Sequence, residues 1–521
     1  MISQYDSIRN LLQNRSRDET ATINQYCLIL SGYYLIVQSW CFTYYKSTEN
    51  MSETHANGHN GNGVAKPHAP IITLSSQEAE DAIARFQDFI RFETVSVTAP
   101  GTGAYKACAQ FLLEQLEQLG MLSEIHLLKE APDHSPVVVA HWKGKDESLP
   151  VLLLNSHYDV VPADISAWTV PPFQALRKDG KIYGRGTQDM KCVCMQYLEG
   201  IRQIHQLYPT WQPERNIYLS FVPDEEVGGA GMAAFLESSI YKSLPGIALA
   251  VDEGLASTTN TFDVFYGERL PWWIDVTATG PTGHGSRFIE NTAVEQLLEL
   301  SRKALAFRQG QKDLLRMREH ENCTHAVARK SNLGDVTSLN ITTLQAGVKV
   351  GNTFAYNCVP PQAVCSLDIR ISPHMEATEM KNLLDQWCQE CSKAPEDGAK
   401  VTWSYINGRG GVMEHATTST DKMINPWYGV FCNALEKMGC GTVPQIFPAA
   451  TDSRFLRALG VRALGFSPMR NTEIMLHEND EYILESNYLE GIGVYVGLIR
   501  ELGSQTDEID RQLKKRQHQN D

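Results

Sequence analysis

Three short, almost continuous apolar runs constrain the fold of this 521-residue chain more than any other feature of its sequence. They are VLLLN, NIYLSFV and GIALAV, and stretches with apolar residues at helical spacing, such as MKCVCMQYLEGIRQIHQLY, separate them. A strand that is apolar on both faces must be buried on both faces, as happens when helices cover the two sides of a parallel sheet. The alternation of such strands with helices therefore predicts an α/β fold with a mostly parallel central sheet.

A different pattern interrupts this one between residues 268 and 408. The runs WWIDVTATG and AVCSLDIRIS alternate polar and apolar residues, which is typical of a sheet with one face in water. Two stretches with helical spacing, EQLLELSRKALAFRQ and EMKNLLDQWCQEC, would cover the other face. We therefore expect an α+β domain at 268–408, inserted between two parts of the α/β domain at 71–267 and 409–505, and a charged, frayed tail at 506–521.

The first 70 residues differ from the rest of the chain. Residues 20–45 contain no Asp, Glu, Lys or Arg and are long enough to cross a bilayer, which needs about 20 residues. Polar residues such as Gln38 and Thr43 dilute this segment, and residues 46–69 have the composition of a linker. We favour a cytoplasmic protein whose mature chain begins at Met51, with a membrane anchor through residues 20–45 as the alternative.

Charge and cysteine content exclude two classes of function. The formal net charge of −15 argues against nucleic acid as a partner, because nucleic-acid-binding surfaces are basic. Twelve cysteines are too few for a disulfide scaffold of this length. The one Cys-x-x-Cys pair, Cys388 and Cys391, lies in a stretch with helical spacing and has no second pair, so a thiolate zinc site is not expected.

Imidazole and carboxylate side chains gather where the buried strands are expected to end. VLLLN leads into His157 and Asp159, NIYLSFV leads into Glu225 and Glu226, and GIALAV leads into an Asp-Glu-Gly sequence. Between the first two, Asp189 follows a glycine-rich turn, GRGTQ. Each motif alone is compatible with an ordinary surface turn. Ligands of α/β sheets bind beyond the carboxyl ends of the strands, so the motifs together predict one shared crevice.

So many carboxylates in one crevice would repel one another and raise one another's pKa values. A pair of divalent cations would remove this repulsion, and imidazole with carboxylate is a ligand set that suits zinc. In such a site a carboxylate and a water bridge the ions, and one unligated carboxylate accepts a proton from that water. The Glu225–Glu226 doublet can supply one ligand and one base, because adjacent side chains on an extended segment point in opposite directions. Asp159 can accept the second N–H of the His157 imidazole.

These segments resemble the M20 family of co-catalytic zinc hydrolases. The resemblance rests on SHYDVVPADISAWTVPPFQALRKDGKIYGRGTQDMK and FVPDEEVGG, then on PWWIDVTATGPTGHGSRF, NTFAYNCVPPQAVCSLDIR, PAATDSRFLRALGVRALGFSPM and MLHENDEYI. It covers about residues 75–505 and is absent from the first 70.

The resemblance implies two zinc ions per subunit. Their ligands would be His157, Asp189 as the bridging residue, Glu226, Glu253 and His477. Glu225 would be the general base, and Asp159 would orient His157. The choice of Glu253 over Asp252, and of His477 among 15 histidines, rests on the resemblance alone.

The inserted domain would be a lid and dimerisation domain. In the family, the residue that matches His284 reaches across a homodimer to stabilise the tetrahedral oxyanion. Asn357 would be a second contact to the substrate. Arg370 and Arg454 match basic positions suited to bind the substrate carboxylate, and the choice between them stays open. Trp272 and Trp273 are interpreted as packing residues of the core or the lid, with the core favoured, and not as substrate contacts.

The implied activity is hydrolysis of N-acyl-L-amino acids, with neutral or aliphatic side chains, to a carboxylate and a free L-amino acid. A dipeptidase, an acetylornithine-type deacetylase or a D-selective homologue would use the same metal ligands. A catalytically silent dimerising scaffold would lack a ligand or the base, and the sequence lacks none.

Overall fold

The computed structural model describes residues 70–520, apart from 121, 123, 322–332 and 407–413. These residues belong to the second of two compact units, residues 68–521. Within them, no helix is both long and apolar enough to cross a membrane. The apolar segment 20–45 lies outside the described residues, so the membrane anchor stays a prediction.

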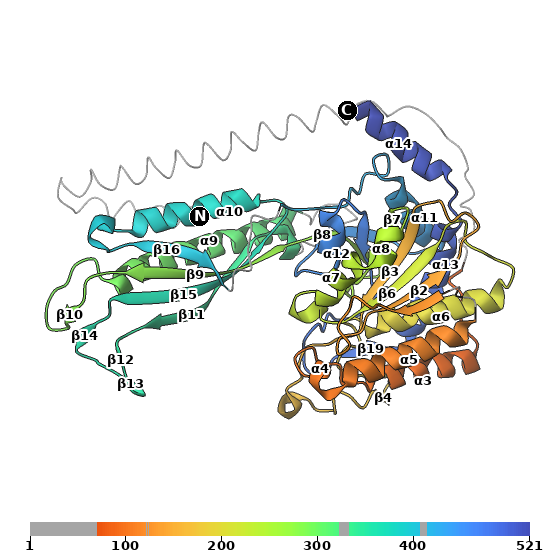
Figure 1. Ribbon diagram of the computed structural model, residues 1–521, viewed down its shortest axis with the longest axis horizontal. Helices are drawn as coiled ribbons and strands as arrows, with labels where there is room; N and C mark the ends of the chain where they lie inside the picture. The colour runs from red at the N-terminus through yellow and green to blue at the C-terminus, as the bar shows by residue number, and fades with distance from the viewer. Residues whose placement is uncertain (1–69, 121, 123, 322–332, 407–413, 521) are drawn as a thin grey trace, which may run out of the picture. The chain divides into compact units, whose positions relative to one another are not determined.

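An eight-stranded sheet forms the centre of the α/β domain, as the apolar runs predict (Figure 1). The neighbours β6, β3, β7 and β18 run parallel, as do β8 and β17, while β1, β2 and the single bridge from β18 to β8 are antiparallel. In sheet order the strands are β1 (Glu124–Leu127), β2 (Val138–Trp142), β6 (Ile217–Val222), β3 (Val151–His157), β7 (Ile247–Asp252), β18 (Ala463–Gly465), β8 (Phe262–Glu268) and β17 (Thr442–Phe447).

Helices cover both faces of this sheet, which explains why its strands are apolar throughout. Leu152 and Leu154 of β3 point into one core with α3, α5, α6, α11 and α13, whereas Leu153 points into another with α7 and α12. The helices of this domain are α3 (Ser76–Ile90), α4 (Ala99–Thr102), α5 (Ala104–Leu119), α6 (Lys191–Leu207), α7 (Ala230–Glu237), α8 (Ser239–Ser243), α11 (Pro426–Lys437), α12 (Ser453–Ala458), α13 (Glu485–Gly503) and α14 (Glu508–Asn520). Short 3-10 turns lie at η1 (Ile165–Ala167), η2 (Glu225–Val227), η4 (Leu333–Asp335) and η5 (Pro395–Asp397).

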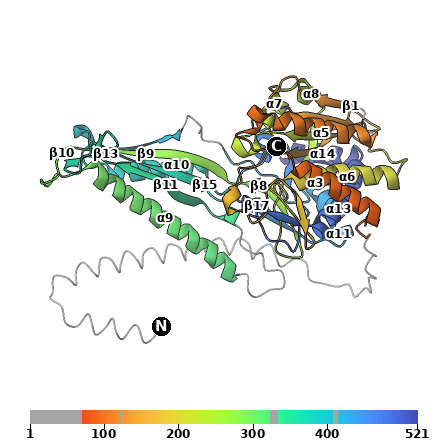
Figure 2. The same ribbon diagram turned by 90° about the horizontal axis from the view of Figure 1, so that it is seen from below.

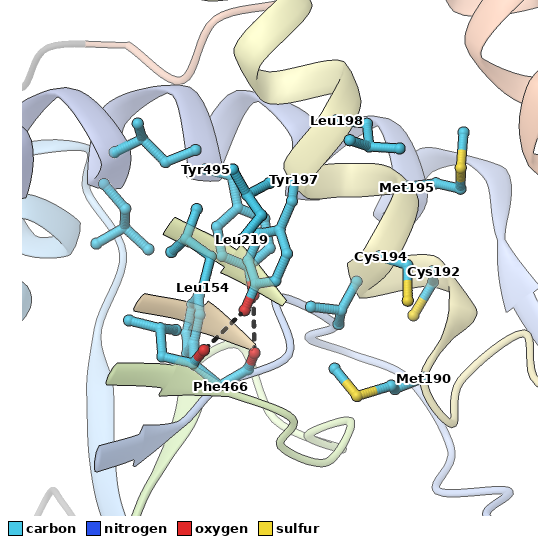
Figure 3. Close-up of a cluster of buried hydrophobic side chains, with 14 of the residues drawn as sticks. Leu154, Met190, Cys192, Cys194, Met195, Tyr197, Leu198, Leu219, Phe466 and Tyr495 are labelled. Atoms are coloured by element: carbon cyan, nitrogen blue, oxygen red, sulfur yellow. Dashed lines mark hydrogen bonds between the residues drawn. The ribbon is translucent and has the colours of Figure 1, made fainter. Parts of the chain in front are cut away.

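Two tyrosines join the helices of the larger core to the sheet (Figure 3). Tyr197 of α6 and Tyr495 of α13 pack at 4.7 Å between ring centroids. The Tyr197 hydroxyl donates to the carbonyl of Val251 at 3.2 Å, and the Tyr495 hydroxyl donates to the carbonyl of Phe466 at 2.8 Å. Each polar atom thus has a partner inside an apolar core, as buried hydroxyls require.

The predicted α+β insertion forms a second sheet with a core of its own. Helices α9 (Ala293–Glu321) and α10 (Ala377–Cys391) pack on one face of the antiparallel order β11, β15, β9, β16 (Figures 1 and 2). These strands are β9 (Leu270–Thr279), β11 (Ser338–Ala346), β15 (Gln362–Ile371) and β16 (Val401–Tyr405). Two small ladders join β10 (Gly283–His284) to β14 (Cys358–Val359) and β12 (Lys349–Val350) to β13 (Thr353–Phe354). The exact domain boundaries stay predictions.

Two further findings bear on the sequence predictions. The expectation of a frayed tail was wrong: α14 packs Ile509 and Leu513 against the main core, because this charged segment carries apolar residues at helical spacing. Every cysteine that the structure describes is a free thiol, and Cys388 and Cys391 are buried in the core of the insertion.

A last, three-stranded sheet has the order β19 (Tyr482–Leu484), β5 (Lys181–Tyr183), β4 (Leu176–Lys178).

Candidate metal centre

Three neighbouring parallel strands, β6, β3 and β7, end at one edge of the central sheet. His157 is the last residue of β3, Glu253 follows β7 directly, and Glu225 and Glu226 lie on the turn η2 after β6. The structure thus brings the ends of these strands side by side, as the sequence predicts. The parallel register produces this result, because it brings equivalent ends of neighbouring strands together.

Five side chains meet there in two overlapping groups. His157, Asp189 and Glu253 form one group, and Asp189, Glu226 and His477 form the other, with potential ligand atoms within 4.8 Å of one another in each. Asp189 belongs to both groups. Its Oδ1 lies 3.1 Å from His157 Nε2, and its Oδ2 lies 3.2 Å from His477 Nε2. We call these five residues the carboxylate–imidazole cluster.

The donor set of this cluster fits two divalent cations. Burial raises the pKa of the Glu253 carboxyl well above its ordinary value, with the charge of Asp189 adding to the effect. Burial and the same charge raise the pKa of Glu226 to about 7. Acids crowded in this way are stabilised by positive charge, and imidazole with carboxylate oxygen is a common ligand set for zinc.

The two imidazoles supply that positive charge when only protein groups are considered. Burial alone would lower the pKa of His157, but hydrogen bonds to Asp159, Asp189 and Glu253 outweigh it and raise the pKa well above the ordinary value. Hydrogen bonds to Asp189 and Glu226 raise the pKa of His477 to about 10. A bound cation would displace these protons, because an imidazole ligates a metal only in its neutral form.

Asp159 links the cluster to the η2 turn. Its Oδ1 lies 3.3 Å from His157 Nδ1, and its carbonyl oxygen lies 3.0 Å from the same nitrogen. The Asp159 carboxylate also accepts the backbone N–H groups of Glu225 and Glu226, both at 3.2 Å, and the Ser96 hydroxyl at 2.8 Å. Asp159 is therefore placed both to orient the imidazole, as the sequence predicts, and to fix the turn.

Glu225 and Glu226 face different partners, although the physical reason differs from the one given by the sequence. They lie on a 3-10 turn and not on an extended segment, because Asp224 adopts a left-handed φ of 66° just before them. Glu226 Oε2 lies 3.1 Å from His477 Nε2, whereas Glu225 Oε1 lies 3.3 Å from Arg454 Nη1. Glu225 belongs to neither metal-ligating group.

A cleft of about 1020 Å³ opens over the cluster. Glu225, Glu226 and His477 line it from the α/β domain. Arg370, which pairs with Asp368 at 2.7 Å, lines it from the insertion. The other lining residues include Arg269, Trp273, Arg454 and Phe455. The cleft therefore combines carboxylates, guanidinium groups and aromatic rings.

Comparison with known proteins identifies the family. The profile of peptidase family M20/M25/M40 matches residues 153–501. The chain belongs to this family. Aminoacylase-1 of Dictyostelium discoideum is 41% identical over 435 residues, which cover 82% of this chain and 99% of that protein. Aminoacylase-1 of Mus musculus is 39% identical over 436 residues, which cover 83% and 98%. An M20 family metallo-carboxypeptidase from Sulfolobus solfataricus shares the fold, with a TM-score of 0.57 at 18% identity over 82% of this chain and 100% of that chain.

Two predicted substrate residues of this M20 family member lie together but away from the cleft. His284 pairs with Cys358 in the β10–β14 ladder, and the N–H of Gly285 donates to the carbonyl of Asn357 at 2.7 Å. Both His284 and Asn357 are exposed. Among the described residues that line the cleft, neither is present. The chain brings them to each other but not to the carboxylate–imidazole cluster.

The tryptophan pair on β9 divides between core and cleft. Trp272 is 2% exposed and packs in the core of the insertion, as predicted. Trp273 is 46% exposed and lines the cleft, so the core position favoured for it was wrong. Successive residues of a strand point to opposite faces, and this alternation is the signal that could have separated the two.

Proposed function

We propose that this chain is an aminoacylase that hydrolyses N-acyl-L-amino acids to a carboxylate and a free L-amino acid. The observation that carries the proposal is the pair of ligand groups that share Asp189, with the unligated Glu225 beside them. It occurs in a member of family M20/M25/M40 that is 41% identical to an aminoacylase-1 across almost the whole of that protein.

Two zinc ions per subunit would be held by the cluster. His157, Asp189 and Glu253 would hold one ion, and Asp189, Glu226 and His477 the other, with Asp189 as the bridge. When bound, the ions polarise the amide carbonyl and lower the pKa of a water molecule. Asp159 keeps the His157 ring in the orientation that presents Nε2 to the cluster, since it lies at Nδ1.

Glu225 would act as the general base and then as the general acid. Burial raises the pKa of this carboxyl well above its ordinary value, and the charge of Asp452 adds to this effect. A carboxylate with a raised pKa is a stronger base near neutral pH. It takes a proton from the water as the water oxygen bonds to the carbonyl carbon, and it delivers that proton to the nitrogen as the C–N bond breaks.

Guanidinium groups in the cleft would orient the substrate. Arg454 lies beside Glu225, and Arg370 faces the same cleft from the insertion. Either can pair with the substrate carboxylate, for which guanidinium geometry is well suited. His284 and Asn357 would reach the substrate from the partner subunit of a homodimer, which accounts for their exposure in one chain. We infer a cytoplasmic location, with an anchor through residues 20–45 as the alternative.

The test is hydrolysis of N-acetyl-L-methionine by the purified full-length chain, before and after chelation and after zinc is added back. Activity that is lost with the chelator and restored by zinc is the expected result. Two bound zinc ions without activity on this substrate would move the assignment to a dipeptidase or an acetylornithine-type deacetylase. A chain that binds no metal and has no activity would refute the proposal and favour the scaffold.

A further inference from the structure

The two loops that carry Asp189 and His477 are joined by a buried network centred on Glu481. The Glu481 side chain is 0% exposed. Its Oε1 accepts the backbone N–H groups of Gln188 at 2.7 Å and Asp189 at 3.4 Å. Its Oε2 accepts the N–H of Gly186 at 3.1 Å and Arg185 Nη1 at 2.8 Å. One carboxylate therefore holds the backbone that leads into Asp189.

The same network holds the loop of His477. The Arg185 guanidinium, which pairs with Glu481, also donates to the carbonyl oxygens of His477 at 3.3 Å and Glu478 at 3.2 Å. From the other loop, the Gln188 side chain donates to the carbonyls of Glu473 at 3.0 Å and Tyr482 at 2.8 Å, and it accepts the N–H of Met475 at 3.1 Å. Both loops are thus bound to each other by side chains that are not in the cluster.

Strand pairing places Glu481 at this position. β5 and β19 pair with Tyr183 opposite Tyr482, and the N–H of Gly184 donates to the Glu481 carbonyl at 2.9 Å. The chain then continues from Gly184 into the Asp189 loop, while Glu481 directly precedes β19. The register of two short strands therefore sets which acid faces the Asp189 loop.

His477 depends on this support more than the other members of the cluster do. Its φ of +60° lies in the left-handed region, which non-glycine residues seldom adopt. Its side chain is 50% exposed, so packing alone does not fix it. The backbone of its loop must therefore determine where its imidazole lies relative to Asp189.

We propose that Glu481 is a positioning residue whose carboxylate sets the spacing of Asp189 and His477 that the Asp189–Glu226–His477 ion site needs. This inference rests on the proposed function, because it assumes that the site binds a metal ion. A charged group inside a protein is tolerated only when it is paired and hydrogen-bonded, and Glu481 meets this condition through both loops. Loss of a partner that orients metal ligands typically lowers metal affinity by about 10–100-fold.

The test is zinc binding by full-length Glu481→Gln, measured by competition with a chelator of known affinity. We expect one of the two zinc ions to bind about 10–100-fold more weakly than in the wild type, because the ion pair with Arg185 is lost. Glu199→Gln is the matched control. Glu199 is also 0% exposed and pairs with Arg85 at 2.6 Å and Arg202 at 3.4 Å, but it contacts neither loop through these pairs. This control should lower the melting temperature and leave both zinc affinities unchanged.

The outcomes separate the inference from the proposed function. Two zinc ions bound by Glu481→Gln with wild-type affinity, or an equal loss in the two variants, would overturn the inference alone. A wild-type chain that binds no zinc would refute the proposed function and the inference with it. If Glu481→Gln does not fold, Gln188→Ala removes two hydrogen bonds to the His477 loop and one to the first residue of β19 without changing a charge. Weaker binding of one of the two zinc ions by that variant supports the inference, and unchanged affinity for both ions overturns it.

Discussion

The carboxylate–imidazole cluster and the His284–Asn357 pair differ in how completely one chain builds them. In the cluster, side chains from the ends of three strands and from two loops form two groups, in each of which the potential ligand atoms lie within 4.8 Å of one another. The His284–Asn357 pair is exposed on the insertion and is held by two strands of two residues each. The single chain assembles the first region, whereas the second lies outside both ligand groups and is not among the described residues that line the cleft.

The physical chemistry of burial explains this contrast. Buried charges must find their partners within the fold, so the cluster can exist only with its hydrogen bonds formed. An exposed imidazole is hydrated by solvent, so it carries no desolvation penalty and needs no partner within the chain. We therefore expect metal binding to be a property of each chain, and turnover to require an arrangement that brings His284 to a cleft.

Glu225→Gln should give the largest loss, on the order of 10³-fold in kcat/KM, because the water loses its proton acceptor. Zinc content should stay at two ions per chain, because Glu225 lies in neither ligand group. The measurement is hydrolysis of N-acetyl-L-methionine together with zinc analysis of the same samples. The adjacent variant Glu226→Gln is the control and should lose zinc as well as activity. A Glu225→Gln chain with wild-type turnover would contradict the assignment of the base.

His284→Ala should reduce kcat by about 10²-fold, through loss of one donor to the oxyanion. Zinc content and melting temperature should not change, because the side chain is exposed and outside the cluster. Mixing this variant with Glu225→Gln sharpens the contrast between the two regions. If His284 serves the partner subunit, random heterodimers each contain one complete site, and about a quarter of the wild-type activity returns. No recovery in verified heterodimers would place His284 in its own chain's site.

In the zinc-free chain, the free energy of unfolding should decrease as pH rises. The pKa of Glu226 is raised from 4.5 to about 7 and that of His477 from 6.5 to about 10. The metal-free folded chain therefore holds protons that the unfolded chain has released, and this stabilisation is lost as pH rises through 7 and then 10. Asp189 acts in the opposite sense, but its lowered pKa has no further effect well above 3.8.

Zinc binding has the reverse dependence, because its ligands must be deprotonated. The melting temperatures of zinc-loaded and metal-free chains should thus move apart by several degrees between pH 6 and pH 9. Differential scanning fluorimetry across this range measures the gap. A gap that narrows with pH would show that these groups do not form the ion sites.

The sequence predicted those parts of the cluster that follow from strand geometry. His157 and the Glu225–Glu226 doublet were found because parallel strands end at one edge. Asp252 and Glu253 could not be told apart, since Asp252 is the last residue of β7 and Glu253 follows it directly. The Asp252 carboxylate accepts hydrogen bonds from the Asn155 side-chain N–H at 2.9 Å and from the Ser453 hydroxyl at 2.8 Å. Ser453 is 201 positions away along the chain, so no local pattern indicates this contact.

The place of His477 in the cluster likewise could not be predicted from local sequence patterns. It lies in a loop nearly 300 residues from Asp189, with a left-handed backbone that no spacing of apolar residues indicates. The Glu481–Arg185 network that supports this loop gave no sequence signal either, because an acid before a short strand is common on protein surfaces. Only the pairing of β5 with β19 shows that Glu481 is buried.

Substitution of Trp273 should have the smallest effect on activity. Trp273 and Arg370 of the insertion line the cleft of their own chain, whereas His284 does not. Contact of its ring with about 50 Å² of an apolar substrate side chain is worth about 1 kcal/mol, so Trp273→Ala should raise KM for N-acetyl-L-methionine by about fivefold. Stability should hardly change, because the ring is half exposed. Its neighbour Trp272 is the matched control: Trp272→Ala should lower the free energy of unfolding by about 3–5 kcal/mol through a cavity in the core. An unchanged KM in Trp273→Ala would mean that the aromatic wall of the cleft does not contact the substrate, and that the insertion contributes to catalysis only through residues outside this cleft.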